Sequence, residues 1–165
     1  MKKLLLVIDV QRDFINQNTS KTLDNLKKLI DLKKYDLVAF TRFINDKSNI
    51  LYKKLNYKGC MTAKQQEIVI HTVNYKIFDK RVYTAVNSEL KQFIEKNKID
   101  EIYLCGFDTD ACILKTALDL FENNYCVKII ENCCMSSYGK EVHQNAINIL
   151  KKLIGEKNII NDFSW

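Results

Sequence analysis

The chain has 165 residues, of which 47% are hydrophobic, so a disordered protein is excluded and one domain over residues 1–165 is expected. Lysine and arginine outnumber aspartate and glutamate by 26 to 20, which gives a formal charge of +6. The lysines are scattered in pairs along the chain, and no nucleic-acid-binding motif accompanies them. This distribution is typical of solvated helix faces, so no nucleic-acid partner is expected.

The first element is expected to be a buried strand and not a targeting segment. The start MKKLLLVIDV resembles a signal peptide, but its apolar run covers only Leu4 to Ile8. Asp9 then interrupts the run, and no small-residue cleavage site follows. No apolar run in the chain approaches the ~20 residues of a membrane span. The sequence therefore predicts a cytoplasmic protein with no membrane partner.

Apolar runs and helical patterns alternate along the rest of the chain. Short apolar or β-branched runs predict strands at 4–8, 36–40, 102–106 and 127–130, with weaker candidates at 75–78 and 158–160. Apolar residues at helical spacing predict helices at about 20–33, 86–97, 109–123 and 139–153. This order predicts an α/β fold in three layers, with a parallel sheet, helices on both faces and right-handed crossovers. Residues 42–74 show few periodic signals and are expected to form an excursion over the sheet with a short helix.

Polar residues at the carboxyl ends of the predicted strands indicate where a site would form, because open parallel sheets bind ligands there. Asp9 follows the first strand, where a buried carboxylate needs a partner. Lys80 follows the strand at 75–78. In a sheet of order 3-2-1-4-5-6, Asp9 and Cys112 would face each other, with Lys80 approaching from the third strand. Taken singly, Asp9 is also compatible with a role in anchoring a loop. Lys80 is also compatible with an ordinary exposed position at the end of a strand.

Cys112 has an unusual position among the six cysteines. It lies in the first turn of the helix that Thr109 or Asp110 would cap. A helix N-terminus and a nearby lysine both favour a thiolate, so a lowered pKa is expected for this thiol. The other interpretation is a buried structural thiol. The remaining five cysteines form no CxxC pair, and with only two histidines in the chain a zinc site or a disulfide framework is not expected.

Three motifs together resemble the isochorismatase-like cysteine hydrolases, a family that includes nicotinamidases, over nearly the whole chain. The family's D-x-Q-x-D-F pattern is met by residues 9–14, DVQRDF. Its lysine before a Tyr-Ser-Ala-Phe-like run is met by Lys80 before residues 83–86, YTAV. Its G-x-x-T-D-x-C-V nucleophile motif is met by residues 106–113, GFDTDACI.

The resemblance implies a six-stranded parallel sheet of order 3-2-1-4-5-6 and a catalytic triad of Asp9, Lys80 and Cys112. Asp9 would accept the thiol proton, Lys80 would stabilise the charges, and Cys112 would attack the carbonyl of a small amide through a thioacyl intermediate. The backbone N–H groups of Asp108 and Cys112 would form the oxyanion hole. The resemblance also implies a cis peptide between Phe107 and Asp108, and assembly into dimers or larger homo-oligomers.

The chain departs from the nicotinamidases after the second strand. Those enzymes have a metal-binding cluster of aspartate and histidine there, whereas this region contains no histidine. No metal and no cofactor are therefore expected, and His71 and His143 are assigned surface or packing roles. Candidate pocket residues are Phe14, Arg42, Tyr83 and Phe107. Arg42 would bind a substrate carboxylate or, alternatively, anchor the excursion.

Two functions of different classes are compatible with the sequence. One is a metal-independent cysteine hydrolase that acts on a carbon–nitrogen bond. The alternative is a non-catalytic member of the same fold that binds a metabolite or senses redox state, for which the adjacent Cys133 and Cys134 offer a thiol pair. The aromatic end of the chain, residues 163–165, is a candidate to pack against a neighbouring subunit or, alternatively, against its own subunit.

Overall fold

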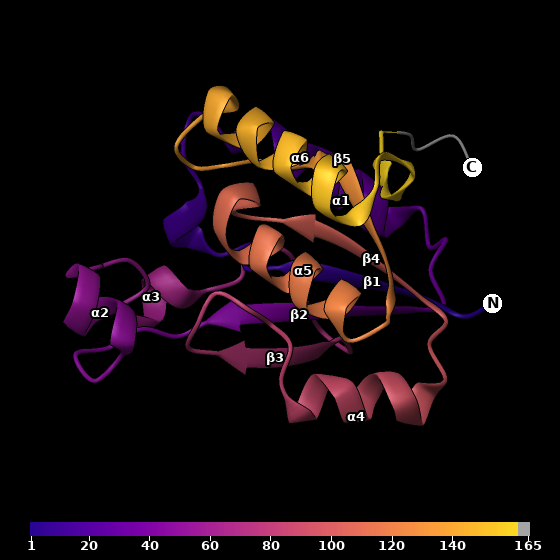
Figure 1. Cartoon of the computed structure of the whole chain (residues 1–165). Helices are drawn as coiled ribbons and strands as arrows, with labels where there is room; N and C mark the ends of the chain where they lie inside the picture. Colours follow the sequence, from indigo (N-terminus) through magenta and orange to yellow (C-terminus); the bar gives the residue numbers. More distant parts are fainter. Residues whose placement is uncertain (162–165) are drawn as a thin grey trace.

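A single parallel sheet of six strands organises the computed structural model, which describes residues 1–161 (Figure 1). The strand order is β3-β2-β1-β4-β5-β6, so the predicted order is confirmed. All pairings between neighbours are parallel. The strands are β1 (Lys3–Ile8), β2 (Leu37–Phe43), β3 (Lys76–Lys80), β4 (Glu101–Gly106), β5 (Cys126–Cys134) and β6 (Ile159–Ile160).

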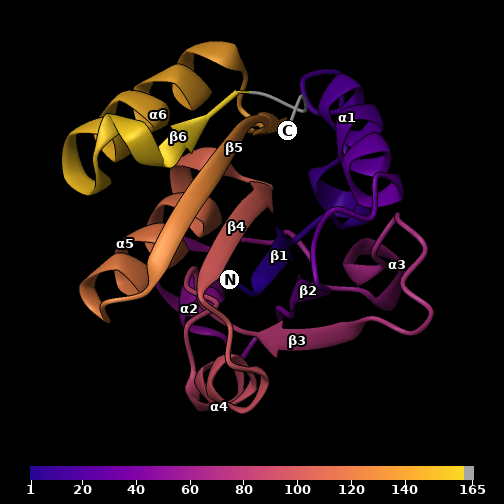
Figure 2. The ribbon, with the colours of Figure 1, turned by 90° about the vertical axis from the view of Figure 1, so that its right-hand side faces the viewer.

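Helices cover both faces of this sheet, as the β-α-β order predicted. Figure 2 shows α5 and α6 over one face and α1 over the other. The helices are α1 (Ser20–Asp31), α2 (Ile50–Leu55), α3 (Ala63–Gln66), α4 (Ser88–Asn97), α5 (Leu114–Glu122) and α6 (Lys140–Ile154). No helix within residues 1–161 combines the length and the apolar character that crossing a membrane requires.

The core is built around β1, which lies between β2 and β4. Its residues Leu4 to Ile8 are fully buried because helices cover both faces of a central strand. Complete burial of one such side chain stabilises the fold by about 1.5–3 kcal/mol. The continuous apolar run in the sequence thus reports the position of β1 in the middle of the sheet.

The excursion after β2 lies beyond the carboxyl ends of the strands and carries two short helices, α2 and α3 (Figure 1). Gln11 anchors it: its amide donates to the Gln66 carbonyl of the excursion at 3.1 Å and to the Phe43 carbonyl at the end of β2 at 2.9 Å. The Asp13 carboxylate accepts from the Cys60 N–H at 2.7 Å. Both anchors belong to the DVQRDF motif, so this motif holds the excursion over the sheet.

The end of β4 brings the chain close to β1. Gly106 has φ +118, and a Cβ at this position would lie 2.1 Å from the Ile8 carbonyl oxygen. Only glycine fits such an approach. Phe107 then donates its N–H to the same carbonyl at 2.9 Å, and this contact directs the chain into the turn that carries Cys112. The Phe107–Asp108 peptide is cis, as the resemblance implied.

Candidate active site

Three strands bring Asp9, Lys80 and Cys112 together at one end of the sheet. Asp9 follows β1, Lys80 ends β3, and Cys112 lies in a five-residue π-helical turn, Thr109–Ile113, after β4. The Lys80 Nζ lies 2.7 Å from Asp9 Oδ2 and donates to Cys112 Sγ at 3.3 Å. All three are buried, at 0%, 5% and 6% exposure in chain order. The structure therefore brings together the three residues that the sequence singled out.

Thr41 fixes the carboxylate of Asp9. Its hydroxyl donates to Asp9 Oδ1 at 2.6 Å, and the Asp9 N–H donates back to the same hydroxyl at 3.1 Å. Asp9 has a backbone φ angle of 46°, in the left-handed region that residues other than glycine rarely adopt. A reciprocal pair of hydrogen bonds holds the residue in that conformation. Thr41 was not assigned a role from the sequence, because a threonine within a strand is common.

Besides the Asp9 carboxylate, two backbone carbonyls and an aromatic ring hold the Lys80 ammonium in place. The Nζ donates to the carbonyls of Val82 and Tyr83, each at 3.0 Å, and lies 5.2 Å from the ring centre of Phe43. Burial by itself lowers the pKa of Lys80, but Asp9 and Cys112 outweigh this effect and the net pKa is raised. Lys80 is consequently a fixed positive charge next to the sulfur.

The structure contradicts the expectation that the pKa of Cys112 is low. Burial raises the pKa of the Cys112 thiol, and the Asp9 carboxylate raises it further, while Lys80 lowers it by less. Burial in a medium of low dielectric constant disfavours the charged thiolate, and here burial and Asp9 together outweigh the effect of the lysine. The raised pKa favours the neutral thiol, and the sulfur lies beside the Asp9–Lys80 ion pair.

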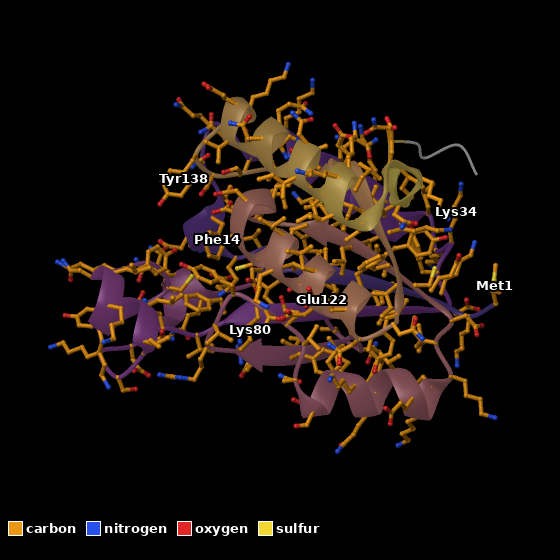
Figure 3. All side chains as sticks on the ribbon, in the orientation of Figure 1. Met1, Phe14, Lys34, Lys80, Glu122 and Tyr138 are labelled. Carbon is orange, nitrogen blue, oxygen red and sulfur yellow. The ribbon has the colours of Figure 1, made fainter. Side chains whose placement is uncertain are left out.

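A cavity of about 830 Å³ opens above this cluster, and Cys112 lies in its wall. Figure 3 shows Phe14, Lys80 and Tyr138 at this end of the molecule, opposite Met1 and Lys34. The wall is formed by the segments that follow β1, β3, β4 and β5, together with the end of β2, the excursion and α5. Its described lining residues are Asp13, Phe14, Asn16, Phe43, Leu51, Leu55, Tyr57, Gly59, Tyr83, Asp108, Asp110, Ala111, Cys112, Leu114, Lys115, Leu118, Ser137 and Tyr138.

Two of the four predicted pocket residues, Phe14 and Tyr83, line the cavity, and two do not. Arg42 points to the opposite face of β2 from Phe43, because side chains alternate along a strand. Its guanidinium forms a two-pronged pair with Asp79, at 2.8 and 2.9 Å. Phe107 is fully buried in the core. Arg42 is thus not among the residues that line this cavity, and both of the roles offered for it stay predictions.

The carboxylate of Asp108, a residue that lines the cavity, is held by the segment that follows β5. Its carboxylate accepts from the Ser137 N–H and from the Ser137 hydroxyl, each at 2.7 Å. Burial raises the pKa of Asp108 to about 6, although the Ser137 hydrogen bonds lower it. The oxyanion role of the Asp108 and Cys112 N–H groups stays a prediction, and both residues lie in the cavity wall.

The two histidines have different positions. His71 is exposed, whereas His143 on α6 is buried and lies 2.8 Å from the hydroxyl of Thr109, in the Cys112 turn. Burial lowers the pKa of His143. Within residues 1–161, no group of three or more histidine, cysteine, aspartate or glutamate side chains is arranged to hold a metal ion. These residues therefore do not provide the ligands of a metal centre.

Comparisons with known proteins agree with this architecture. The family model described as "Isochorismatase domain" matches residues 3–157. Isochorismatase family protein 2A of Dictyostelium discoideum is 27% identical over 143 residues, which cover 83% of this chain and 68% of that protein.

Two solved structures are similar in fold. Nicotinamidase PncA from Bacillus subtilis has a TM-score of 0.82 at 23% identity, covering 94% of this chain and 97% of its own. N-carbamoylsarcosine amidase from Thermoplasma acidophilum has a TM-score of 0.82 at 19% identity, covering 94% of each chain.

Proposed function

Because the chain belongs to the isochorismatase domain family, a family of hydrolases, we propose that it hydrolyses the carbon–nitrogen bond of a small amide with Cys112 as nucleophile. One observation carries the proposal: the Cys112 sulfur lies 3.3 Å from Lys80, which pairs with Asp9 at 2.7 Å, and the sulfur faces an 830 Å³ cavity. A nucleophile, a base and a charge partner in hydrogen-bonding reach are what nucleophilic catalysis needs. The names of the nicotinamidase and amidase of similar fold point to the same bond type.

The first step forms a thioacyl enzyme. The Cys112 sulfur attacks the carbonyl carbon while its proton passes to the Asp9 carboxylate, and the carbonyl electron pair moves onto oxygen. The raised pKa of the thiol means that the proton leaves during attack and not before it. The N–H groups of Asp108 and Cys112 would bind the oxyanion, an interaction worth about 3–4 kcal/mol per donor in other enzymes. Collapse then breaks the C–N bond, and the leaving nitrogen takes the proton from Asp9.

The second step returns the enzyme to its starting state. Asp9, again ionised, takes a proton from water as the water oxygen attacks the thioester carbon. The tetrahedral intermediate then collapses: the C–S bond breaks, the sulfur takes the proton that Asp9 holds, and the carboxylic acid leaves. Lys80 keeps its charge throughout and balances whichever of Asp9, sulfur or oxyanion is negative at that moment. Its rigid contacts keep this balancing charge in place.

The redox-sensing alternative draws little support from the other thiols. Cys133 and Cys134 are 0% and 1% exposed, and burial raises the pKa of both. Redox-sensing cysteines are accessible and have low pKa values.

The proposal is tested by screening small amides for release of ammonia or amine, followed by acid quenching and intact mass measurement. Wild type is expected to turn over and to accumulate an acyl mass on the peptide that contains Cys112. Cys112→Ala is expected to lose both signals, whereas Cys126→Ala, which alters an exposed thiol, keeps them. Full activity in Cys112→Ala on a verified substrate would overturn the mechanism.

A further inference from the structure

The wall of the cavity carries an excess of negative charge. Asp13, Asp108 and Asp110 contribute three carboxylates to it. Lys115 is the one cationic side chain among the described residues of the wall, and it is already paired with Asp119. Behind the wall, Lys80 is balanced by Asp9. A ligand in the cavity therefore meets a negative potential, although the whole chain is positively charged.

The three carboxylates differ in the hydrogen bonds that they accept within the protein. Asp108 accepts two hydrogen bonds from Ser137, and Asp13 accepts one from the Cys60 N–H. Asp110 Oδ1, in contrast, is buried and has no hydrogen-bond partner among residues 1–161. Because no donor among these residues reaches this oxygen, no hydrogen bond offsets the negative charge at that end of the Asp110 carboxylate. Asp110 and Cys112 both lie in the turn Thr109–Ile113 and both line the cavity, so the charge of Asp110 acts on the cavity that Cys112 also lines.

Aromatic rings form much of the remaining wall. Phe14, Phe43, Tyr57, Tyr83 and Tyr138 all line the cavity. The face of an aromatic ring carries partial negative charge and attracts organic cations. Carboxylates beside aromatic rings form an environment that suits an amine or a quaternary ammonium and disfavours a carboxylate.

We propose that this cavity selects positively charged ligands, so that the substrate is a small amide with an amine or quaternary ammonium as its second functional group. Asp110 and Asp13 set this preference through the negative charge of their carboxylates. The substrate class rests on the proposed hydrolase activity, whereas the charge preference is a property of the cavity itself. The preference runs against one of the two roles that the sequence left open for Arg42, the binding of a substrate carboxylate.

The charge preference is measured at Cys112 without any substrate. Cationic aminoethyl and anionic sulfonatoethyl methanethiosulfonate each form a mixed disulfide with the thiol and release methanesulfinate. Their rates are compared at one pH, so that ionisation of the thiol cancels from the ratio. The exposed Cys126 in the same protein provides the reference ratio. We expect the ratio of the cationic to the anionic reaction rate to be at least roughly tenfold higher at Cys112 than at Cys126. Tenfold is the lower end of the rate effect that charged clefts have on charged ligands.

Two variants and a salt series identify the source of the preference. Asp110→Asn and Asp13→Asn are each expected to lower the ratio at Cys112 several-fold. The matched control Asp24→Asn changes a carboxylate on α1, outside the cavity, and is expected to leave it unchanged. Salt provides a test that needs no variant: between about 0.01 M and about 1 M the Debye length falls from roughly 30 Å to roughly 3 Å, and the ratio should fall with it.

The charge preference and the hydrolase function are judged separately. A ratio at Cys112 equal to that at Cys126, or unmoved by Asp110→Asn, overturns the charge preference whatever the enzyme hydrolyses. If amides are hydrolysed, a higher kcat/KM for an amine-bearing amide than for its neutral isostere supports the substrate class, and no difference overturns it. If the ratio is high but Cys112→Ala does not impair hydrolysis, the cavity preference stands and the proposed mechanism fails.

Discussion

The Lys80 ammonium and the Asp9 carboxylate lie 2.7 Å apart with their side chains 2% and 0% exposed. A buried ion pair of this kind adds little net stability, because each charge has lost its hydration. Removal of one partner is costly, because the other charge is left alone in the interior. The pair is therefore best explained by its contact with Cys112 and not by fold stability.

This relationship predicts a double-mutant cycle with opposite outcomes for stability and activity. Lys80→Met and Asp9→Asn are each expected to destabilise the fold, by about 3–5 kcal/mol where an uncompensated charge remains. The double variant should recover most of that loss, since no lone charge remains, and yet stay inactive. Urea unfolding and turnover of a verified amide measure the two quantities. Additive losses of stability would show that the two charges do not interact.

Thr41→Val should lower kcat by roughly 10–100-fold with little change in KM. The hydroxyl donates to Asp9 at 2.6 Å, and a hydrogen bond to a charged group is worth about 1.5–3 kcal/mol. Thr41→Ser keeps the donor and should restore most of kcat. Thr116→Val is the matched control, because it also removes a buried hydroxyl, which accepts from the Ala85 N–H at 3.0 Å, but not one that contacts Asp9. A matching loss of kcat in the control would assign the effect to packing.

Alkylation of Cys112 should respond to Asp9 in the direction opposite to hydrolysis. Burial and the Asp9 carboxylate both raise the pKa of the thiol, so iodoacetamide is expected to modify exposed Cys126 faster than Cys112 at neutral pH. Asp9→Asn removes one cause of the raised pKa and leaves Lys80 beside the sulfur. This variant should alkylate faster at Cys112 while hydrolysing no amide. Mass spectrometry of each cysteine peptide gives the rates, and slower alkylation in Asp9→Asn would contradict the assignment.

The raised pKa of Asp108 predicts how stability depends on pH. The folded pKa is about 6, against an ordinary value of 3.8. Between these values the folded state binds more protons than the unfolded state, so the free energy of unfolding falls as pH rises through this window. The cost above it is about 3 kcal/mol at most.

Asp108→Asn cannot ionise and should remove this dependence. We expect the variant to gain stability relative to wild type at pH 7.5 and to gain little at pH 4, as measured by urea unfolding at both values. The amide introduced by this substitution retains an oxygen that accepts from the Ser137 N–H, so the turn is expected to stay in place. An equal effect at both pH values would show that the carboxyl group does not titrate in this window.

The sequence predicted the elements well because a strand that is buried on both faces of a parallel sheet consists almost entirely of apolar residues. The run at 4–8 is apolar throughout since both faces of β1 are covered, and the observed strand is Lys3–Ile8. The run at 36–40 predicted only part of β2, which continues to Phe43 through Thr41 and Arg42. Polar residues at the end of a strand resemble a loop in sequence, although here they pair with β3. The suggestion that residues 163–165 contact a subunit lies outside the described residues.

The sequence by itself determined which elements form, the order of the sheet through its family motifs, and the three chemical groups at the strand ends. The tertiary structure alone decided the protonation of Cys112, since its pKa depends on burial and on charges from β1 and β3. It also decided that Arg42 faces away from the cavity while Asp110 and Tyr57 line it. Local patterns specify the backbone path, but the electric field and the walls of a site arise from segments that meet only after folding.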